Sequence, residues 1–373
     1  MRGIICTGAG IAAAFAASVG SAQEMRAASP IPAGANVIYA SARAQEKDPF
    51  GLDADALYVA DLDGNVTRIT HSRFAHNHFA VAPNRRYVAA NRYSRGDINK
   101  DGKYFPYDDW KELWLIDTRT GNERRIATDY DAGWGGVAWS PDSRWIYFST
   151  PTQPSVMDVG RVNIESGKVE LLTGRLNQLL GYGPQQSNKS VTDVDVSKDG
   201  EWLVFNYRSP EMMVDGMRGG KPKARIGVMK LDGSEARLVS DGGPQEPGRR
   251  GVWPVGDFDP AISPDGKQIV YARVTDVGWI TPALSTWDLW IVNVDGSGAR
   301  NVSGNGNRTA QVIPSWHEND WIAYTQATRE DPRRAPYLLN LKTGERVRVD
   351  AEGRHVQQIP SGSQAVQVTR TSE

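Results

Sequence analysis

A short strand–turn–strand pattern recurs along the chain, and this repeat constrains the fold more than any other feature. Clear copies are ELWLIDTRTGNERRIA from Glu112 and DLWIVNVDGSGARNVS from Asp288. Alternating apolar and polar residues predict strands, and the Asp-Gly or Thr-Gly pair between them predicts a hairpin turn. Further copies begin at Ala56, Gly160, Arg225 and Pro336.

A second pattern precedes five of these copies and again contains two short strands around a tight turn. It reads VAWSPDSRWIYFST from Val137 and DPAISPDGKQIVYAR from Asp259. Proline at the second turn position restricts φ, and Asp, Gly or Asn follows as a turn former. The other copies begin at Phe79, Asp193 and Ile313.

Two strands of each kind make a four-stranded sheet, and such sheets recur here at intervals typical of β-propellers. The predicted fold class is all-β: a six-bladed β-propeller of four-stranded blades. The copy at Ala56 lacks its inner strands. We expect residues 36–40 to form one of them and the stretch that begins at His355 to supply the rest. The N- and C-terminal strands would then share one blade and close the ring, which removes free sheet edges.

The inner turns Ser140-Pro141-Asp142 and Ser263-Pro264-Asp265-Gly266 are similar to the WD40-like Pro-Asp-Gly repeats of TolB-like propellers. The resemblance extends over the whole predicted mature chain, implies the fold and leaves the function open. TolB itself carries a further N-terminal α/β domain, for which we expect no room between the signal and the first strand. The repeats also resemble the propellers of prolyl oligopeptidase-type peptidases, but the G-x-S-x-G motif of their hydrolase domain does not occur here.

The N-terminus has the pattern of a secretory signal peptide. Arg2 precedes an apolar stretch from Gly3 to Val19, and Gly20-Ser21-Ala22 forms a small-x-small cleavage site. We therefore predict a signal peptide over residues 1–22, a short segment over 23–34 and a single β-propeller domain over 35–373. No later stretch approaches the ~20 apolar residues of a membrane span. These features favour a periplasmic or secreted protein with no transmembrane segment.

Composition excludes several other classes of function. The formal net charge is −1, which favours neither nucleic acid nor an anionic membrane as partner. The single cysteine, Cys6, lies in the predicted signal, so the mature chain would have no cysteine nucleophile and no Cys-ligated zinc site. We expect a monomer that binds a protein, peptide or glycan.

Antiparallel connectivity predicts which face of the propeller is functional. With strands a to d numbered outward from the axis, the a–b and c–d turns are tight, whereas the b–c and d–a connections are long. Function concentrates on loops, so the loop-rich face and its axial opening are the expected binding surface. The residues that we expect to ring or reach this opening are His76, His78, Trp134, Asp193, Trp253, Asp257, Asp259, Gln311, His355 and Gln357. Alternatively, these side chains bind only structural water and backbone.

One b–c loop has the ligand spacing of a calcium site. Asp97, Asn99, Asp101, Lys103 and Asp108 stand at positions one, three, five, seven and twelve of an EF-hand-like or dockerin-like loop. Calcium takes six to eight oxygen ligands, and Gly102 at the sixth position permits the sharp turn. We predict a structural calcium ion as cofactor. The alternative is an Asp- and Asn-rich turn without metal.

The sequence favours binding over catalysis and leaves one enzymatic alternative open. No nucleophile motif and no evident catalytic dyad is present, so we name no catalytic residue. The histidines at 71, 76 and 78, together with His355, permit a transition-metal site near the axis. Propeller lyases that act on oligogalacturonate have a His-bearing metal centre. The alternative is therefore a metal-assisted carbohydrate lyase or hydrolase with its site at the axial opening.

Overall fold

The structure is a computed structural model that describes most of the predicted propeller. The described residues are 29–41, 43, 56–61, 63–71, 78–92, 112–127, 136–153, 156–172, 190–208, 224–243, 256–281, 284–303, 309–318, 320–350 and 353–359. The predicted signal peptide and the predicted calcium loop lie outside them. No helix in the described part of the chain is long and apolar enough to cross a membrane.

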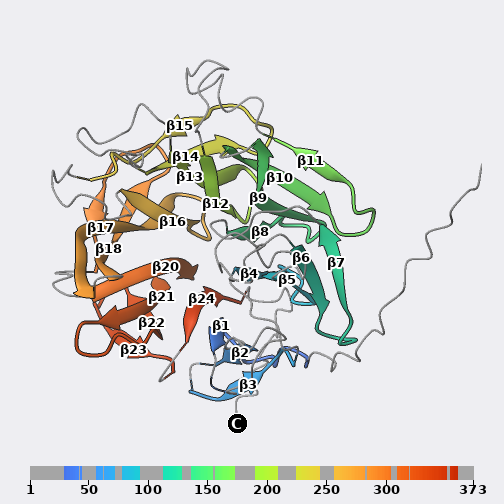
Figure 1. The fold of residues 1–373 in the computed structure, drawn as a ribbon, viewed down its shortest axis with the longest axis horizontal. Coiled ribbons are helices and arrows are strands. Elements are labelled where there is room, and N and C mark those ends of the chain that lie inside the picture. Colours follow the sequence, from blue (N-terminus) through green and yellow to red (C-terminus); the bar gives the residue numbers. More distant parts are fainter. Residues whose placement is uncertain are drawn as a thin grey trace, which may run out of the picture.

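The described strands form six antiparallel units of four strands, and Figure 1 shows these blades arranged around a central axis. The strands are given from the axis outward. Blades 1 to 3 are β24 (Arg354–Gln358), β1 (Val37–Ser41), β2 (Ala56–Ala60) and β3 (Val66–Arg68); β4 (Phe79–Val81), β5 (Tyr87–Arg92), β6 (Glu112–Asp117) and β7 (Glu123–Ala127); and β8 (Val137–Trp139), β9 (Trp145–Gln153), β10 (Val156–Asn163) and β11 (Val169–Leu171). Blades 4 to 6 are β12 (Ser190–Val196), β13 (Trp202–Arg208), β14 (Arg225–Lys230) and β15 (Arg237–Leu238); β16 (Asp257–Ile262), β17 (Gln268–Thr281), β18 (Leu284–Asn293) and β19 (Arg300–Asn301); and β20 (Thr309–His317), β21 (Trp321–Thr328), β22 (Ala335–Asn340) and β23 (Arg346–Arg348).

The two ends of the chain meet in blade 1. β24 pairs antiparallel with β1, with Gln358 opposite Val37 and Gln357 opposite Ile38. Figure 1 shows the C-terminal strand, in red, beside the N-terminal strand, in blue. The prediction that the terminal strands share one blade is thus confirmed, and so is the all-β propeller class.

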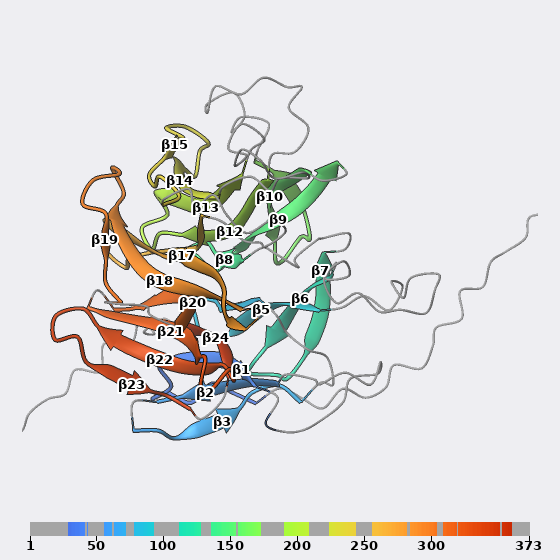
Figure 2. The same ribbon diagram turned by 60° about the vertical axis from the view of Figure 1, so that its left-hand side comes forward.

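Each of six buried apolar clusters combines side chains from two neighbouring blades. The cluster between blades 5 and 6, for example, packs Val270 and Leu289 against Trp316 and Tyr324. In Figure 2 the strands of blade 6 follow one another outward, so each blade presents a broad face to its neighbour. The core is therefore divided among the interfaces between blades, and the repeat that forms one blade also forms the surface that the next blade covers.

Backbone pairing joins three pairs of neighbouring blades at the point where strands a and c begin. Single parallel bridges connect Met157 with Ser190, Ala224 with Gly256, and Trp287 with Ala310. Only glycine fits at 256, since its φ is +113° and a Cβ would lie 2.3 Å from the carbonyl oxygen of Ala224. These bridges fix the spacing of the inner strands around the axis.

The tight inner turns have one design. The N–H of Ser143 donates to the carbonyl of Ser140 at 2.9 Å, and the Ser140 hydroxyl accepts the N–H of Trp145 and donates to Asp142. The turns that begin at Ser197 and Ser263 repeat these bonds.

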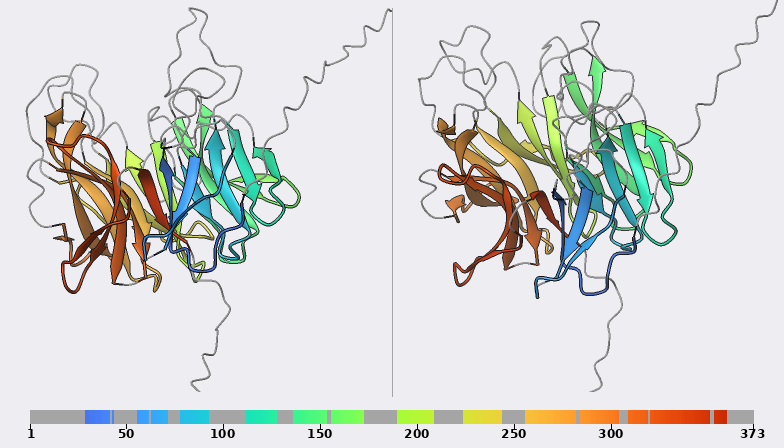
Figure 3. Two further views of the ribbon diagram at one scale, coloured as in Figure 1. Left: turned by 90° about the horizontal axis from the view of Figure 1, so that it is seen from below. Right: turned by 60° about the horizontal axis from the view of Figure 1, so that its bottom comes forward.

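Figure 3 shows the blades edge-on, with their strands running between two faces of the ring.

One expected loop is instead a strand pair. We expected a connection over residues 275–286, but β17 continues to Thr281 and β18 begins at Leu284, with Asp276 opposite Thr286 and Thr281 opposite Leu284. The segment is rich in Val, Thr and Ile, which favour extended backbone, and the register shifts next to Asp276.

Candidate functional site

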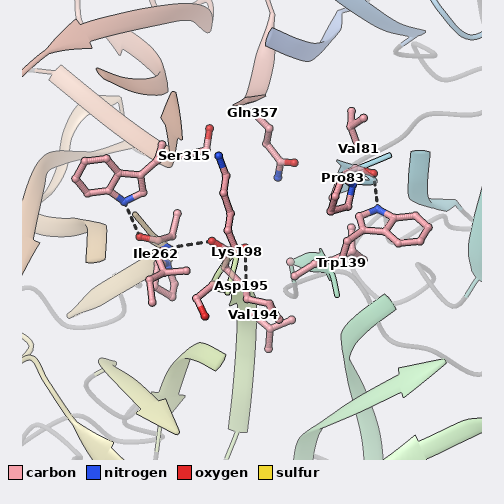
Figure 4. Close-up of a pocket in the computed structure, with 18 of the residues that line it drawn as sticks. Val81, Pro83, Trp139, Val194, Asp195, Lys198, Ile262, Ser315 and Gln357 are labelled. Atoms are coloured by element: carbon pink, nitrogen blue, oxygen red, sulfur yellow. Dashed lines mark hydrogen bonds between the residues drawn. The ribbon is translucent and has the colours of Figure 1, made fainter. Parts of the chain in front are cut away.

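The inner strands enclose an axial cavity of about 570 Å³, which is within the range of small-molecule binding pockets. Figure 4 views it with residues from several blades converging on the centre. All six blades contribute to its wall. Each blade contributes residues from its strand a or from the position just before it: His78, Gly136, Asp193, Asp259, Ile313 and Gln357.

Three of these inner strands have unusual backbone at equivalent positions. Asp193, Asp259 and Ile313 have φ of 53°, 52° and 53°, a region that L-residues with a Cβ seldom adopt. In each strand the register with strand b shifts around this residue, as in a β-bulge. Bulges change the direction in which a side chain points, and strained backbone concentrates at functional sites. The positive φ values and register shifts therefore favour blades 4 to 6 as the functional part of the cavity wall.

Asp193 and Asp259 are two buried carboxyl groups on adjacent blades. Burial raises the pKa of Asp193 well above its ordinary value, and the charge of Asp259 raises it further. Burial also raises the pKa of Asp259 to about 6, although the N–H of Ile313 donates to its Oδ2 at 3.2 Å. The Thr192 hydroxyl donates to Asp193 at 3.1 Å. Both carboxylates are therefore less stabilised in their ionised form than an aspartate in water.

Arg208, at the end of β13, acts electrostatically on both acids. Its charge lowers the pKa of Asp193 and of Asp259, but this effect does not outweigh burial, which raises both pKa values. The guanidinium donates to Asn206 at 3.1 Å and to Thr192 at 3.3 Å, and it lies over the ring of Phe258. Arg334 acts on Asp259 in the same sense. The cluster thus combines two acids with two arginines, from blades 4 and 6.

Asp257 has a different environment although it lies two residues from Asp259. Its carboxylate, fully buried, accepts two hydrogen bonds from Arg273, at 2.6 and 2.9 Å, and a third from the N–H of Gly242. Arg273 also contacts Asp241 and lies 4.3 Å from the ring centroid of Trp290. This bidentate pair ties strand b of blade 5 to the residues after β15, and Asp257 is not among the residues that line the cavity.

The turn end of the cavity has its own charged residues. Asp195 lies on β12, and burial raises its pKa to about 6 even though its oxygens accept the N–H groups of Ile262 and Val196. Lys198 follows in the turn after β12. Burial lowers the pKa of its ammonium group, while the charges of Glu318 and Asp195 raise it.

The structure places the predicted ligand residues in three groups. His78 and Asp193 line the cavity, as do Asp259 and Gln357. Gln311 and Asp257 are buried beside it, and the Gln311 amide donates to Gln326 at 3.1 Å. His76, Trp134 and Trp253 lie outside the described residues, and of His355 only the backbone in β24 is described. Their roles stay predictions.

The metal hypotheses also stay predictions. Asp97, Asn99, Asp101, Lys103 and Asp108 all lie outside the described residues, so the calcium site is untested. Within the described part of the chain, no three His, Cys, Asp or Glu side chains gather as potential metal ligands.

Sequence reasoning missed three residues of this cavity or its surroundings: Asp195, Lys198 and Arg208. A signal for one of them was present. When the inner turns are aligned, Lys198 stands where other repeats have Pro83, Pro141 and Pro264. Arg208 ends a strand in a polar context and had no such signal.

Comparison with known proteins agrees with the fold. No protein-family model matches the chain. An uncharacterised protein of Agrobacterium fabrum, Atu1656, is 29% identical over 182 residues, which are 46% of this chain and 52% of that protein. The chain thus matches about half the length of this curated relative.

Two solved structures are similar in fold. TolB from Acinetobacter baumannii superposes with a TM-score of 0.57 and 15% identity, over 87% of this chain and 66% of that one. A chain from the nidogen/laminin complex has a TM-score of 0.54 and 9% identity, over 88% of this chain and 100% of that one. At these identities the likeness concerns the fold alone. The chain has the fold of a TolB-like β-propeller.

Proposed function

We propose that this protein is a periplasmic or secreted binding protein whose axial cavity takes a positively charged group of its ligand, the amino group of a peptide chain end, at Asp193 and Asp259. The observation that carries the proposal is the raised pKa of both carboxyl groups despite Arg208. A ligand ammonium supplies the charge that the protein leaves uncompensated, and its binding lowers both pKa values.

The surroundings of the pair support recognition of a peptide. His78 and Gly136 also line the cavity, and Val137 and Val194 add apolar surface. A small number of polar groups in a mostly apolar concave wall is typical of ligand sites. The structurally similar chain from the nidogen/laminin complex belongs to a protein–protein assembly, which is compatible with a propeller that binds protein.

The test compares two probes that differ by one charge: tetra-alanine amide with a free amino terminus, and the same peptide N-acetylated. We expect the free amine to bind at least about tenfold more tightly at pH 7.5, because a charge-assisted hydrogen bond is about twice as strong as a neutral one. Asp193→Asn and Asp259→Asn should each reduce this preference. Asp265→Asn, on an exposed inner turn, is the matched control and should keep it.

The pH dependence gives a second readout of the same site. The pKa of Asp259 is about 6, so the carboxylate that attracts the amine becomes protonated as the pH falls from 7.5 to 5. The preference for the free amine should therefore decrease over this interval, as measured by isothermal titration calorimetry. Equal binding of the two probes by the wild type, or no binding of either, contradicts the proposal.

The metal-assisted lyase or hydrolase remains the second candidate, and one observation favours it. A carboxyl group with a raised pKa is suited to act as a general acid near neutral pH, and Asp193 and Asp259 both have this property. Metal-dependent cleavage of oligogalacturonate by the purified protein, lost in Asp193→Asn, would establish this function in place of binding alone.

A further inference from the structure

Four inner turns share one hydrogen-bonded geometry but differ at the second position. In each, the N–H of the fourth residue donates to the carbonyl of the first, at 2.8 Å in the turn that begins at Ala82 and at 2.9 Å in those that begin at Ser140, Ser197 and Ser263. Their second residues are Pro83, Pro141, Lys198 and Pro264. Proline restricts φ at this position and thereby reduces the entropy of the unfolded chain. Lysine forms the same turn without that advantage, so the turn itself does not explain Lys198.

The position of the Lys198 side chain offers an explanation. Lys198 lines the axial cavity, as do the three prolines. Figure 4 shows its side chain extending from blade 4 across the centre towards Ser315 and Gln357, whose amide points back into the cavity. Among the lining residues that the structure describes, Lys198 is the only lysine or arginine.

Two neighbouring acids, Glu318 and Asp195, act on the Lys198 ammonium group through their charge. Both oxygens of Asp195 accept backbone N–H groups, from Val196 at 2.9 Å and from Ile262 at 3.0 Å. Glu318 is exposed at the surface of the blade 6 turn. None of the ion pairs among the described residues includes the Lys198 ammonium group. An ammonium group inside a cavity, with an amide opposite and no carboxylate in ion-pair contact among the described residues, has the chemistry of an anion contact.

We propose that Lys198 and Gln357 form a carboxylate-binding contact at the turn end of the axial cavity. The ammonium group supplies the charge and the Gln357 amide a hydrogen-bond donor. The carboxylate comes either from the C-terminus of a peptide or from a small organic acid. This inference rests on the proposed function in one respect, that the cavity takes a ligand, and it gives the ligand an acidic group opposite the amine that Asp193 and Asp259 attract.

The experiment uses probes without an amine, so that it is independent of the acid pair. N-acetyl-tetra-alanine with a free carboxylate is compared with its C-terminal amide by calorimetry on the full chain. We expect the wild type to bind the acid at least about tenfold more tightly than the amide. Lys198→Met, which keeps the length and apolar stem of the side chain, should abolish this preference. Lys198→Arg, which keeps the charge, should retain most of it.

Controls separate this contact from other causes. Lys267→Met changes an exposed lysine on the neighbouring inner turn and should leave the preference unchanged. Lys198→Met should still prefer the free-amine probe of the acid pair, which shows that the variant is folded and that its cavity binds. If acetate competes with the peptide acid in the wild type, the contact serves small acids; if it does not, the contact serves a peptide end. Equal binding of acid and amide by the wild type, no binding of either, or an unchanged preference in Lys198→Met would overturn the proposal.

Discussion

The two sides of the axial cavity are built from the same repeat but differ in the charge that they carry. On the side of β4 and β8 the wall consists largely of small and apolar residues, such as Ala80, Val137 and Ala138, and its acid is Asp142 in the turn after β8. On the side of β12 and β16 it carries Asp193, Asp195, Lys198 and Asp259. We call these the apolar side and the charged side. The blades thus share one strand pattern, but the side chains that line the cavity differ from blade to blade.

Backbone geometry follows the same division. Asp193 and Asp259 on the charged side have positive φ, whereas His78 and Gly136, at the corresponding places on the apolar side, do not among the described residues. Positive φ costs a residue with a Cβ on the order of 1 kcal/mol or more. Positive φ also occurs in turns, at Arg85, Ser143, Glu235 and Glu318, but within the inner strands it is found only in blades 4 to 6 among the described residues.

The largest expected effect is a loss of stability, and it distinguishes the Arg273–Asp257 ion pair, which is structural, from Asp259, which lines the cavity. Arg273→Met leaves Asp257 buried without a counter-ion, and loss of one partner of a buried pair costs about 3–5 kcal/mol in the free energy of unfolding. Asp259→Asn should cost less than about 1 kcal/mol, because the native carboxylate is itself unfavourably buried. Denaturant titration measures both. Arg86→Met, which removes the more exposed Arg86–Asp117 pair, is the control at under about 1 kcal/mol. A loss for Arg273→Met no larger than that control would contradict this division.

An intermediate effect should appear in the pH dependence of stability. The folded pKa of Asp195 is about 6, above its unfolded value, so its contribution to stability is present at low pH and is lost as the pH rises from about 4 through 6. A shift of two pKa units corresponds to about 3 kcal/mol, and partial exposure reduces the expected loss to about 1–2 kcal/mol. In Asp195→Asn the melting temperature should therefore fall less than in the wild type over this interval.

The control for this measurement has the opposite sign. Burial opposes ionisation of Asp265, but bonds from the Ser263 hydroxyl and the Lys267 N–H outweigh it and lower the pKa of this carboxyl group. Its stabilisation is present above the unfolded pKa and is lost as the pH falls through the lower folded value. Asp265→Asn should therefore lose stability at pH 6 relative to the wild type. Parallel pH profiles for the wild type and Asp195→Asn would argue against the raised pKa.

The smallest expected effect tests what the two sides share. The indole N–H of Trp139 donates to the carbonyl of Ala80 at 2.9 Å, and that of Trp316 donates to the carbonyl of Ala261 at 3.0 Å, each in the preceding blade. Trp139→Phe and Trp316→Phe should each lower the free energy of unfolding by about 1 kcal/mol or less, because one carbonyl loses its hydrogen-bond donor. Clearly unequal losses would show that inter-blade packing is not the same on the apolar side and near blade 5.

Sequence reasoning reached further for the fold than for the site. The Pro-Asp-Gly turns and the Asp-Gly hairpins were sufficient to predict four-stranded blades and closure by β24 and β1. They were not sufficient to distinguish Asp257 from Asp259, which are equally polar and lie on one short strand. Arg273, sixteen residues later, determines that Asp257 is a structural partner. Asp259 lies in the bulge between Phe258 and Ala261 and lines the cavity, and no local sequence pattern predicts that bulge.

The sequence by itself determined the blade, because strand alternation and turn chemistry are local properties and each blade repeats them. Lys198 was also visible there, as a departure from proline within an aligned repeat. Only the tertiary structure decided which charged residues share an environment. Asp193 and Asp259 are 66 positions apart in the chain, yet the packing of two adjacent blades places both in the wall of one cavity. Burial raises the pKa of both carboxyl groups, and the charge of Asp259 raises that of Asp193 further; both causes exist only after the blades have packed around the axis.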